Sequence, residues 1–167
     1  SMAIVVDNSN AVRTGRTAIG EDGKVHDVVT GGVSKLNIAV ESAKRVVDLM
    51  REGDTLSCIA YDDSARVVFD NLEVSDRSVI LHHLDSVKEH YGMNTNISEA
   101  LLRADEMLSK YDDAMPKRVL FFTDGTPTGN DTEHKGIIAG QKLAAHNIAD
   151  AHGIRLTGNI LFSVKEA

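Results

Sequence analysis

Aromatic residues and cysteine are scarce in this chain of 167 residues, which has no tryptophan, one cysteine and an aromatic content of 4%. A folded core must therefore consist mainly of aliphatic side chains. The single cysteine, Cys58, cannot form an internal disulfide, so the sequence gives no sign of an oxidising compartment. Because Cys58 lies in the apolar run of residues 56–61, we expect it to be a small buried hydrophobe.

Basic residues are in the minority. The chain has 18 Lys and Arg against 25 Asp and Glu, which gives a formal net charge of -7. Nucleic-acid binding depends on cationic side chains that displace counterions from the phosphate backbone. The charge therefore has the wrong sign for a nucleic-acid partner, and we predict none.

Long apolar segments are also missing. No stretch approaches the ~20 apolar residues of a transmembrane helix, and residues 1–10 lack the basic region and long apolar region of a secretory signal. We expect no membrane span in this chain and a cytoplasmic location. Excision from an exported parent protein is the alternative that the sequence leaves open.

The chain nevertheless has ordinary globular composition, with 42% hydrophobic and 26% charged residues. Its length fits one domain over residues 1–167, because domains cluster near ~100–150 residues. Strand-like segments at 3–6, 55–61 and 118–123 alternate with helix-like segments. This alternation is typical of a mainly parallel sheet covered by helices.

Local patterns predict further elements. The link at residues 62–64 is too short for a crossover helix, so a strand at 65–69 should run antiparallel to the strand before it. Apolar spacing predicts a helix over 36–50, for which Gly53 supplies a left-handed stop, and a second helix capped by Ser75.

Two more helices follow in the second half of the chain. Asn96 and Glu99 resemble a capping box at the start of one. The other begins near Glu133, includes Ile148 and Ala151 in its apolar stripe, and is expected to end at Gly153.

The segments outside these helices complete the predicted order. The last strand should lie within 154–164. Between Ala11 and Leu36 the pattern breaks into a long loop, in which residues 24–29 (KVHDVV) could form a short strand.

Three polar clusters occupy the places where such a sheet binds ligands, beyond the carboxyl ends of its strands. They are residues 7–11 after the first strand, 92–96 before a helix, and 123–126 after the RVLFF strand. Any one cluster alone is better explained as a turn or a helix cap. Together they offer carboxylates and hydroxyls without histidine, an oxygen set suited to Mg²⁺, Mn²⁺ or Ca²⁺.

In this order the clusters resemble the metal-ion-dependent adhesion site of the von Willebrand factor A domain, with its DxSxS, GxTN-like and TDG motifs. The resemblance also covers the helix at 35–50 and the strand pair at 54–69. It implies a three-layer Rossmann-like α/β fold with one antiparallel edge strand, helices on both faces and no catalytic activity. With short right-handed connections, the strand at 3–6 should be central between 55–61 and 118–123. Domains of this family usually continue past the strand at 160–163 with another helix, which the chain to residue 167 does not provide.

The resemblance also implies a ligand set. Ser9 and Thr95 would bind the metal directly, while Asp7 and Asp124 would hold it largely through water. The last serine of DxSxS is Ala11 here, so we expect metal affinity to be lower by roughly tenfold, or metal to be absent altogether.

A divalent ion held in this way remains under-neutralised and gains from an anionic oxygen supplied from outside. We therefore expect a partner protein with an exposed Asp or Glu. The residues expected to contact it lie beside the site: Asn10, Arg13, Arg16, Gly125 and Thr126.

Two alternatives remain at this stage. The segment VVDNSNAVRTG resembles the opening of the proteasomal ubiquitin-receptor A domain, which departs from the full metal motif, so a metal-free scaffold subunit of a larger assembly is one. The other is a phosphohydrolase that uses Asp7 as its nucleophile. Aspartate-dependent phosphatases need a second Asp two residues later, where this chain has Ser9, so we predict a non-enzymatic interaction module.

Overall fold

The computed structural model describes residues 1–8, 16–19, 25–28, 33–89, 92–111, 116–123, 131–147, 150–155 and 160–165. The main sheet has the order β6-β5-β1-β7-β8-β9. Its strands are β1 (Met2–Asp7), β5 (Thr55–Tyr61), β6 (Ala65–Glu73), β7 (Arg118–Thr123), β8 (Asp150–Arg155) and β9 (Ile160–Lys165). The helices are α2 (Lys35–Leu49), α3 (Arg77–Ser86), α4 (Ile97–Leu108) and α5 (Glu133–Asn147), with short 3-10 turns η1 (Val74–Asp76) and η2 (Val87–Glu89).

Strand pairing confirms the predicted arrangement. β1 is central and pairs in parallel with β5 on one side and β7 on the other. β6 is an edge strand antiparallel to β5, and β8 continues the parallel sheet beyond β7. β9 pairs with β8 in antiparallel orientation and adds a second antiparallel pair at the far edge.

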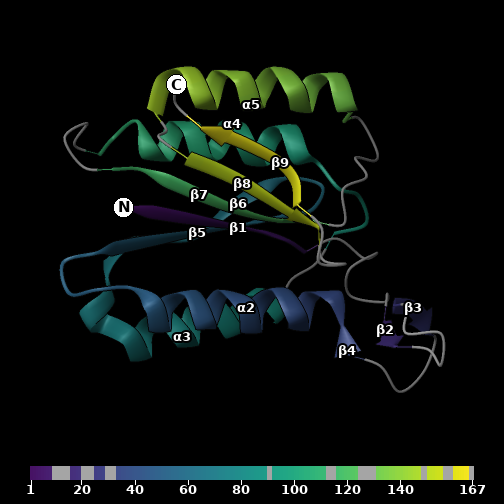
Figure 1. Cartoon of the computed structure of the whole chain (residues 1–167), viewed down its shortest axis with the longest axis horizontal. Coiled ribbons are helices and arrows are strands. Elements are labelled where there is room, and N and C mark those ends of the chain that lie inside the picture. Colours follow the sequence, from purple (N-terminus) through teal and green to yellow (C-terminus); the bar gives the residue numbers. More distant parts are fainter. Residues whose placement is uncertain are drawn as a thin grey trace.

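Alternation along β1 divides its side chains between the two faces of the sheet. Ile4 and Val6 belong to a core with the apolar stripes of α2 and α3, whereas Ala3 and Val5 belong to a core with α4. Figure 1 shows α2 and α3 on one side of the sheet and α4 on the other, with α5 packed beside α4. The result is the three-layer α/β fold that the sequence predicted.

The long early loop contains a small sheet of its own. It has the order β3-β2-β4 and consists of β2 (Arg16–Ile19), β3 (Val25–Val28) and β4 (Val33–Ser34). β3 confirms the short strand expected within KVHDVV. Figure 1 shows this sheet beside the start of α2, on the side where the carboxyl end of β1 lies.

Helix boundaries confirm two of the predicted local signals. Gly53 has a φ of 85°, in the turn where Asp54 N donates to Arg51 O at 3.0 Å. Asn96 Oδ1 accepts from Glu99 N at 3.1 Å, and Asn96 Nδ2 donates to Glu99 Oε2 at 3.2 Å. Asn96 and Glu99 therefore form the predicted capping pair, and the Glu99 carboxylate bonds to the Asn96 side chain.

Two predicted boundaries are wrong. Ile148 lies outside the described residues, whereas Ala151 and Gly153 lie in β8 instead of the last helix, because α5 ends at Asn147. Pairing of residues 150–155 with β7 outweighs the helical spacing of a few apolar residues. Ser75 does not cap α3 either: it lies within η1, and the residue before the helix, Asp76, makes no side-chain cap bond.

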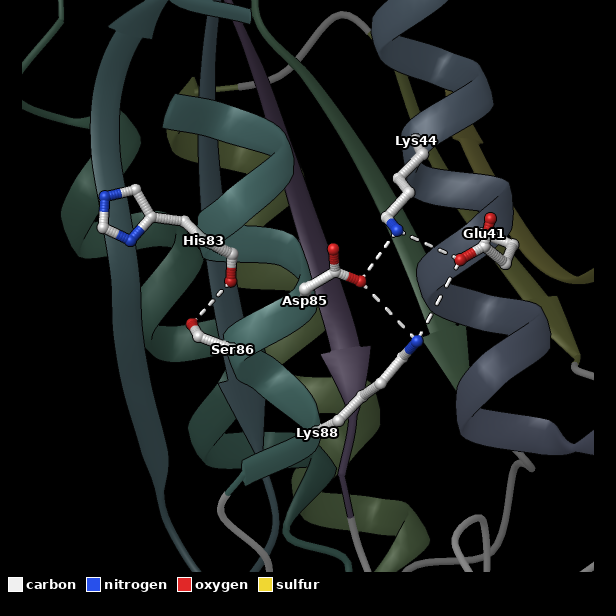
Figure 2. Close-up of polar contacts among 6 residues, drawn as sticks. All are labelled: Glu41, Lys44, His83, Asp85, Ser86 and Lys88. Atoms are coloured by element: carbon white, nitrogen blue, oxygen red, sulfur yellow. Dashed lines mark hydrogen bonds and ion pairs between the residues drawn. The ribbon is translucent and has the colours of Figure 1, made fainter. Parts of the chain in front are cut away.

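Helices α2 and α3 are joined by a group of charged side chains. Figure 2 shows Asp85 of α3 between Lys44 of α2 and Lys88 of η2. Asp85 Oδ1 lies 2.7 Å from Lys44 Nζ and 3.6 Å from Lys88 Nζ, while Lys44 Nζ also donates to Glu41 Oε1 at 3.1 Å. These bonds raise the pKa of Lys44 and lower the pKa of Asp85, chiefly through their mutual hydrogen bond.

The helices are short and amphipathic rather than uniformly apolar. Within the described ranges, no helix has the length and hydropathy needed to cross a membrane.

Candidate metal site

Asp7 ends the central strand at the carboxyl edge of the sheet. By alternation with Ala3 and Val5, its side chain belongs to the α4 face, where it is fully buried at 0% exposure. Thr123 ends the neighbouring β7 and is also buried. Its Oγ1 donates to Asp7 Oδ2 at 3.4 Å, so the first residues of the first and third polar clusters are in contact.

Two aromatic rings line the same face below Asp7. Tyr61 pairs with Asp7 across β1 and β5, and Phe121 pairs with Val5 across β1 and β7. The two rings stack with their centroids 5.3 Å apart, and both residues are buried. This apolar floor lowers the local dielectric, which strengthens any electrostatic interaction made by the Asp7 carboxylate.

Thr95 reaches the same edge from the start of α4. Asn8 N donates to Tyr61 O at 2.7 Å, and Asn96 N donates to Asp62 O at 2.8 Å. The segments that contain Asp7 and Thr95 are thus bonded to two consecutive residues at the end of β5. Thr95 is 3% exposed.

Two described residues, Thr123 at the end of β7 and Asp131 before α5, make side-chain contacts near this edge. Thr123 contacts Asp7 as described above, and Asp131, which precedes α5, contacts the first turn of α4. Asp131 Oδ2 accepts from Ser98 N at 3.1 Å, and Asp131 Oδ1 accepts from Ser98 Oγ at 2.5 Å. Sequence reasoning missed this buried carboxylate, because no motif marks an aspartate that caps a helix 33 residues earlier in the chain.

The described residues thus bring Asp7 and Thr95 to one edge. Arg16 is placed only by its backbone, which opens β2 opposite Val28 and Ser34. The remaining predicted residues lie outside the described part of the chain: Ser9, Asn10, Ala11, Arg13, Asp124, Gly125 and Thr126.

The donor set at this edge fits a hard divalent cation. It offers a buried carboxylate and threonine hydroxyls, the oxygen ligands that such ions prefer. Burial of an ionised carboxylate is costly, and a nearby cation offsets that cost. In the part of the chain that the structure describes, no three His, Cys, Asp or Glu side chains form a metal cluster, so hydroxyls would have to contribute here.

Sequence comparison identifies the family. Residues 2–126 match the family described as von Willebrand factor type A domain. Because this match covers most of the chain, the protein belongs to that family. No curated protein matches the sequence.

Solved structures show the same fold. A von Willebrand factor type A protein from Catenulispora acidiphila superposes with a TM-score of 0.68 at 20% identity, over 92% of this chain and 32% of that one. The protein BatB from Bacteroides thetaiotaomicron gives a TM-score of 0.68 at 19% identity, over 92% of this chain and 64% of that one. Proximal thread matrix protein 1 from the mussel byssus, solved with a zinc-occupied MIDAS motif, gives 0.69 at 14% identity, over 92% and 37%.

This chain therefore spans between about a third and two thirds of the length of these structures.

Proposed function

We propose that this domain is a protein-interaction module that binds a divalent metal ion, Mg²⁺ or Mn²⁺, at the carboxyl edge of its sheet. Asp7, Ser9, Thr95 and Asp124 would hold the ion, and an acidic group of a partner protein would complete its coordination. The observation that carries the proposal is the buried Asp7 carboxylate, placed with Thr123 and the Thr95 segment at one edge.

Each residue has a distinct role in this proposal. Asp7 supplies negative charge from a buried position on the α4 face, and Thr123 orients that carboxylate through its hydroxyl. Thr95 supplies a neutral hydroxyl oxygen. When bound, the ion provides a positive charge and an exchangeable position for an oxygen ligand.

We also propose that the domain works without catalysing a reaction. The family supports an interaction role. A divalent ion held by carboxylates and hydroxyls would bind an acidic group of the partner, and this needs no residue that acts as a nucleophile. Assay of an aryl phosphate with Mg²⁺ tests this directly. Turnover that disappears in Asp7→Asn would contradict the proposal.

A calorimetric titration with MnCl₂ tests metal binding. Thr95→Val keeps the shape of the side chain but removes the hydroxyl. It should weaken Mn²⁺ binding at least tenfold, because replacing even a residue that only supports a metal ligand typically costs about that much affinity. The matched control Thr95→Ser keeps the hydroxyl and should bind within a few-fold of the wild type. Equal affinity in all three proteins would contradict a ligand role for Thr95.

A random peptide library displayed on phage tests the partner chemistry. Peptides selected on the wild-type domain in Mg²⁺ and eluted with EDTA should be enriched in Asp or Glu. The same selection on Thr95→Val should lose that enrichment. Enrichment that persists in EDTA would show that acidic peptides bind without the metal.

Ala11 favours a second candidate function, a metal-free scaffold in a larger assembly. This position lacks the hydroxyl that would complete the DxSxS motif. If the scaffold function is correct, the wild-type domain should give no heat with MnCl₂, and EDTA should leave its partner binding unchanged.

A further inference from the structure

The hairpin turn between β5 and β6 packs against the segment that carries Thr95. The turn consists of Asp62, Asp63 and Ser64, and it is closed by two internal bonds. Asp62 N donates to Ser64 O at 3.0 Å, and Ser64 N donates to Asp62 Oδ1 at 3.3 Å. The neighbouring carboxylate of Asp63 contacts the Thr95 segment.

Asp63 accepts three hydrogen bonds from two consecutive residues. Its Oδ2 accepts from Met93 N at 2.9 Å, and its Oδ1 accepts from Asn94 N at 3.1 Å and from Asn94 Nδ2 at 2.6 Å. These bonds favour the ionised carboxylate and hold the pKa of Asp63 below its usual value. Both backbone N–H groups immediately before Thr95 are therefore held by one side chain.

The residue after Thr95 is held by the same turn. Asn96 N donates to Asp62 O at 2.8 Å, and Asn96 Nδ2 donates to Asp63 O at 3.4 Å. Glu99, which completes the cap of α4, also accepts from Ala65 N at 3.1 Å. Thr95 thus lies between two anchored backbone segments.

Gly92 allows this close approach. A β-carbon at position 92 would lie 2.7 Å from Asp62 Cγ and 2.8 Å from Asp62 Cβ, and it would also meet the Asp63 carboxylate. Contacts this short require the turn or the segment to move. The absence of a side chain at position 92 therefore lets the turn and the Thr95 segment pack this closely.

From this geometry we infer that Asp63 is a positioning residue for the metal site: it fixes the backbone on which Thr95 presents its hydroxyl. The inference rests on the proposed function for its consequence, since Thr95 is a proposed ligand. Asp63 itself is an anchor and not a ligand, because its two oxygens are directed at Met93 and Asn94. Residues that orient metal ligands in this way change affinity when they are replaced.

The test compares two neighbouring carboxylates that differ in their contacts. Asp63→Asn loses acceptor capacity for the Met93 and Asn94 donors. The control Asp62→Asn makes the same charge change at a side chain that accepts a hydrogen bond from Ser64 within the turn instead of from the Thr95 segment. Asp63→Asn should weaken Mn²⁺ binding by about tenfold or more, the range for residues that support metal ligands. Asp62→Asn should bind Mn²⁺ within about twofold of the wild type.

Amide hydrogen exchange of the metal-free proteins gives a readout that does not depend on metal. In Asp63→Asn the amides of Met93 and Asn94 should exchange faster, while those of β1 and β7 keep their wild-type rates. Gly92→Ala should reproduce both effects by displacing the carboxylate. Faster exchange with unchanged Mn²⁺ affinity would overturn the positioning role.

Different results would contradict metal binding by the domain and the positioning role of Asp63. If the wild type binds no Mn²⁺, the proposed metal function is wrong, and exchange alone then decides whether Asp63 holds the segment. Unchanged exchange at Met93 and Asn94 in Asp63→Asn would overturn the anchor itself, whatever the metal data show.

Discussion

Two polar clusters lie on the α4 face at opposite ends of the central strands. The carboxyl-edge cluster contains Asp7, Thr95 and Thr123. The amino-end cluster contains Ser57, Asp70 and Tyr111, which follows α4. Each combines a carboxylate with hydroxyl groups, yet the two carboxylates differ in burial and in their hydrogen bonds.

The side chains of the amino-end cluster hydrogen-bond one another. Ser57 Oγ donates to Asp70 Oδ1 at 3.1 Å and accepts from Asn71 N at 2.9 Å, and Tyr111 OH also donates to Asp70. Asn71 has a φ of 52° and lies where the pairing of β5 and β6 shifts register. Burial, together with the bond to Asp70, raises the pKa of Tyr111 to about 12. The cluster therefore holds together the irregular part of the β5–β6 pairing.

The carboxyl-edge cluster has a different geometry. Its carboxylate is buried at 0% exposure over an aromatic floor, and the bond from Thr123 is long at 3.4 Å. Asp70 at the amino end is instead exposed and accepts hydrogen bonds from Ser57 and Tyr111. The two clusters have similar residue types and differ in the burial and the hydrogen bonding of their carboxylates, which is the basis for placing the proposed ion at the carboxyl edge.

Replacement of the two carboxylates should give the largest contrast. In the wild type, Mn²⁺ at 100 times its Kd should raise the free energy of unfolding by about 2.7 kcal/mol. Asp7→Asn should lose this gain completely, and Asp70→Asn should retain it even though the fold is weakened. Thermal unfolding with and without Mn²⁺ measures both. A full gain in Asp7→Asn would remove the distinction between the clusters.

Repair of the DxSxS motif should sharpen the distinction. Ala11→Ser restores a hydroxyl and should tighten Mn²⁺ binding by roughly tenfold, the scale of a supporting contact. Calorimetry measures the change, and the double variant Ala11→Ser with Asp7→Asn should show no gain. Unchanged affinity in the single variant would mean that position 11 does not reach the site.

Removal of one hydroxyl from the amino-end cluster should affect stability alone. Tyr111→Phe loses the bonds to Ser57 and Asp70 and should lower the free energy of unfolding by about 1 kcal/mol, the typical contribution of a hydrogen bond. Mn²⁺ affinity should stay at the wild-type value. Denaturant unfolding and calorimetry on the same preparation measure both quantities. If Tyr111→Phe also weakened Mn²⁺ binding, the amino-end cluster would not be independent of the metal site.

The smallest effect is expected at the charged group between α2 and α3, away from both clusters. Lys44→Met should cost less than about 1 kcal/mol, because Asp85 is 51% exposed and solvent screens the pair. The pKa of Asp85 is lowered in the folded state, so its contribution is present above the unfolded pKa and is lost as pH falls through the folded one. Unfolding measured from neutral to acidic pH should therefore show the difference between wild type and variant shrinking. A difference that grows toward acid would contradict this assignment.

The sequence predicted those features that depend on local signals or on strong alternation. Asn96 and Glu99 mark a helix start within four residues, and the apolar runs of β1, β5 and β7 contain enough pattern to give their order once the family is identified. Asp7 and Thr95 were predicted to lie at one edge because they belong to ordered motifs, and their role as metal ligands stays a prediction.

Other features depend on contacts between distant segments. Asp63 anchors residues 30 and 31 positions later, and Asp131 caps a helix 33 positions earlier. The first part of β8 was predicted as the end of a helix because Ala151 fits helical spacing, although pairing with β7 decides its conformation. Such choices are set by tertiary contacts that the local sequence does not encode.

Paramagnetic broadening by Mn²⁺ tests the central claim most directly, because it shows where on the domain the ion binds. In a two-dimensional amide spectrum titrated with substoichiometric MnCl₂, signals of Asn8, Thr95 and Thr123 should broaden first. Signals of Ser57, Asp70 and Tyr111 should remain sharp, and EDTA should restore the spectrum. Uniform weak broadening, or broadening centred on the amino-end cluster, would contradict a metal site at the carboxyl edge.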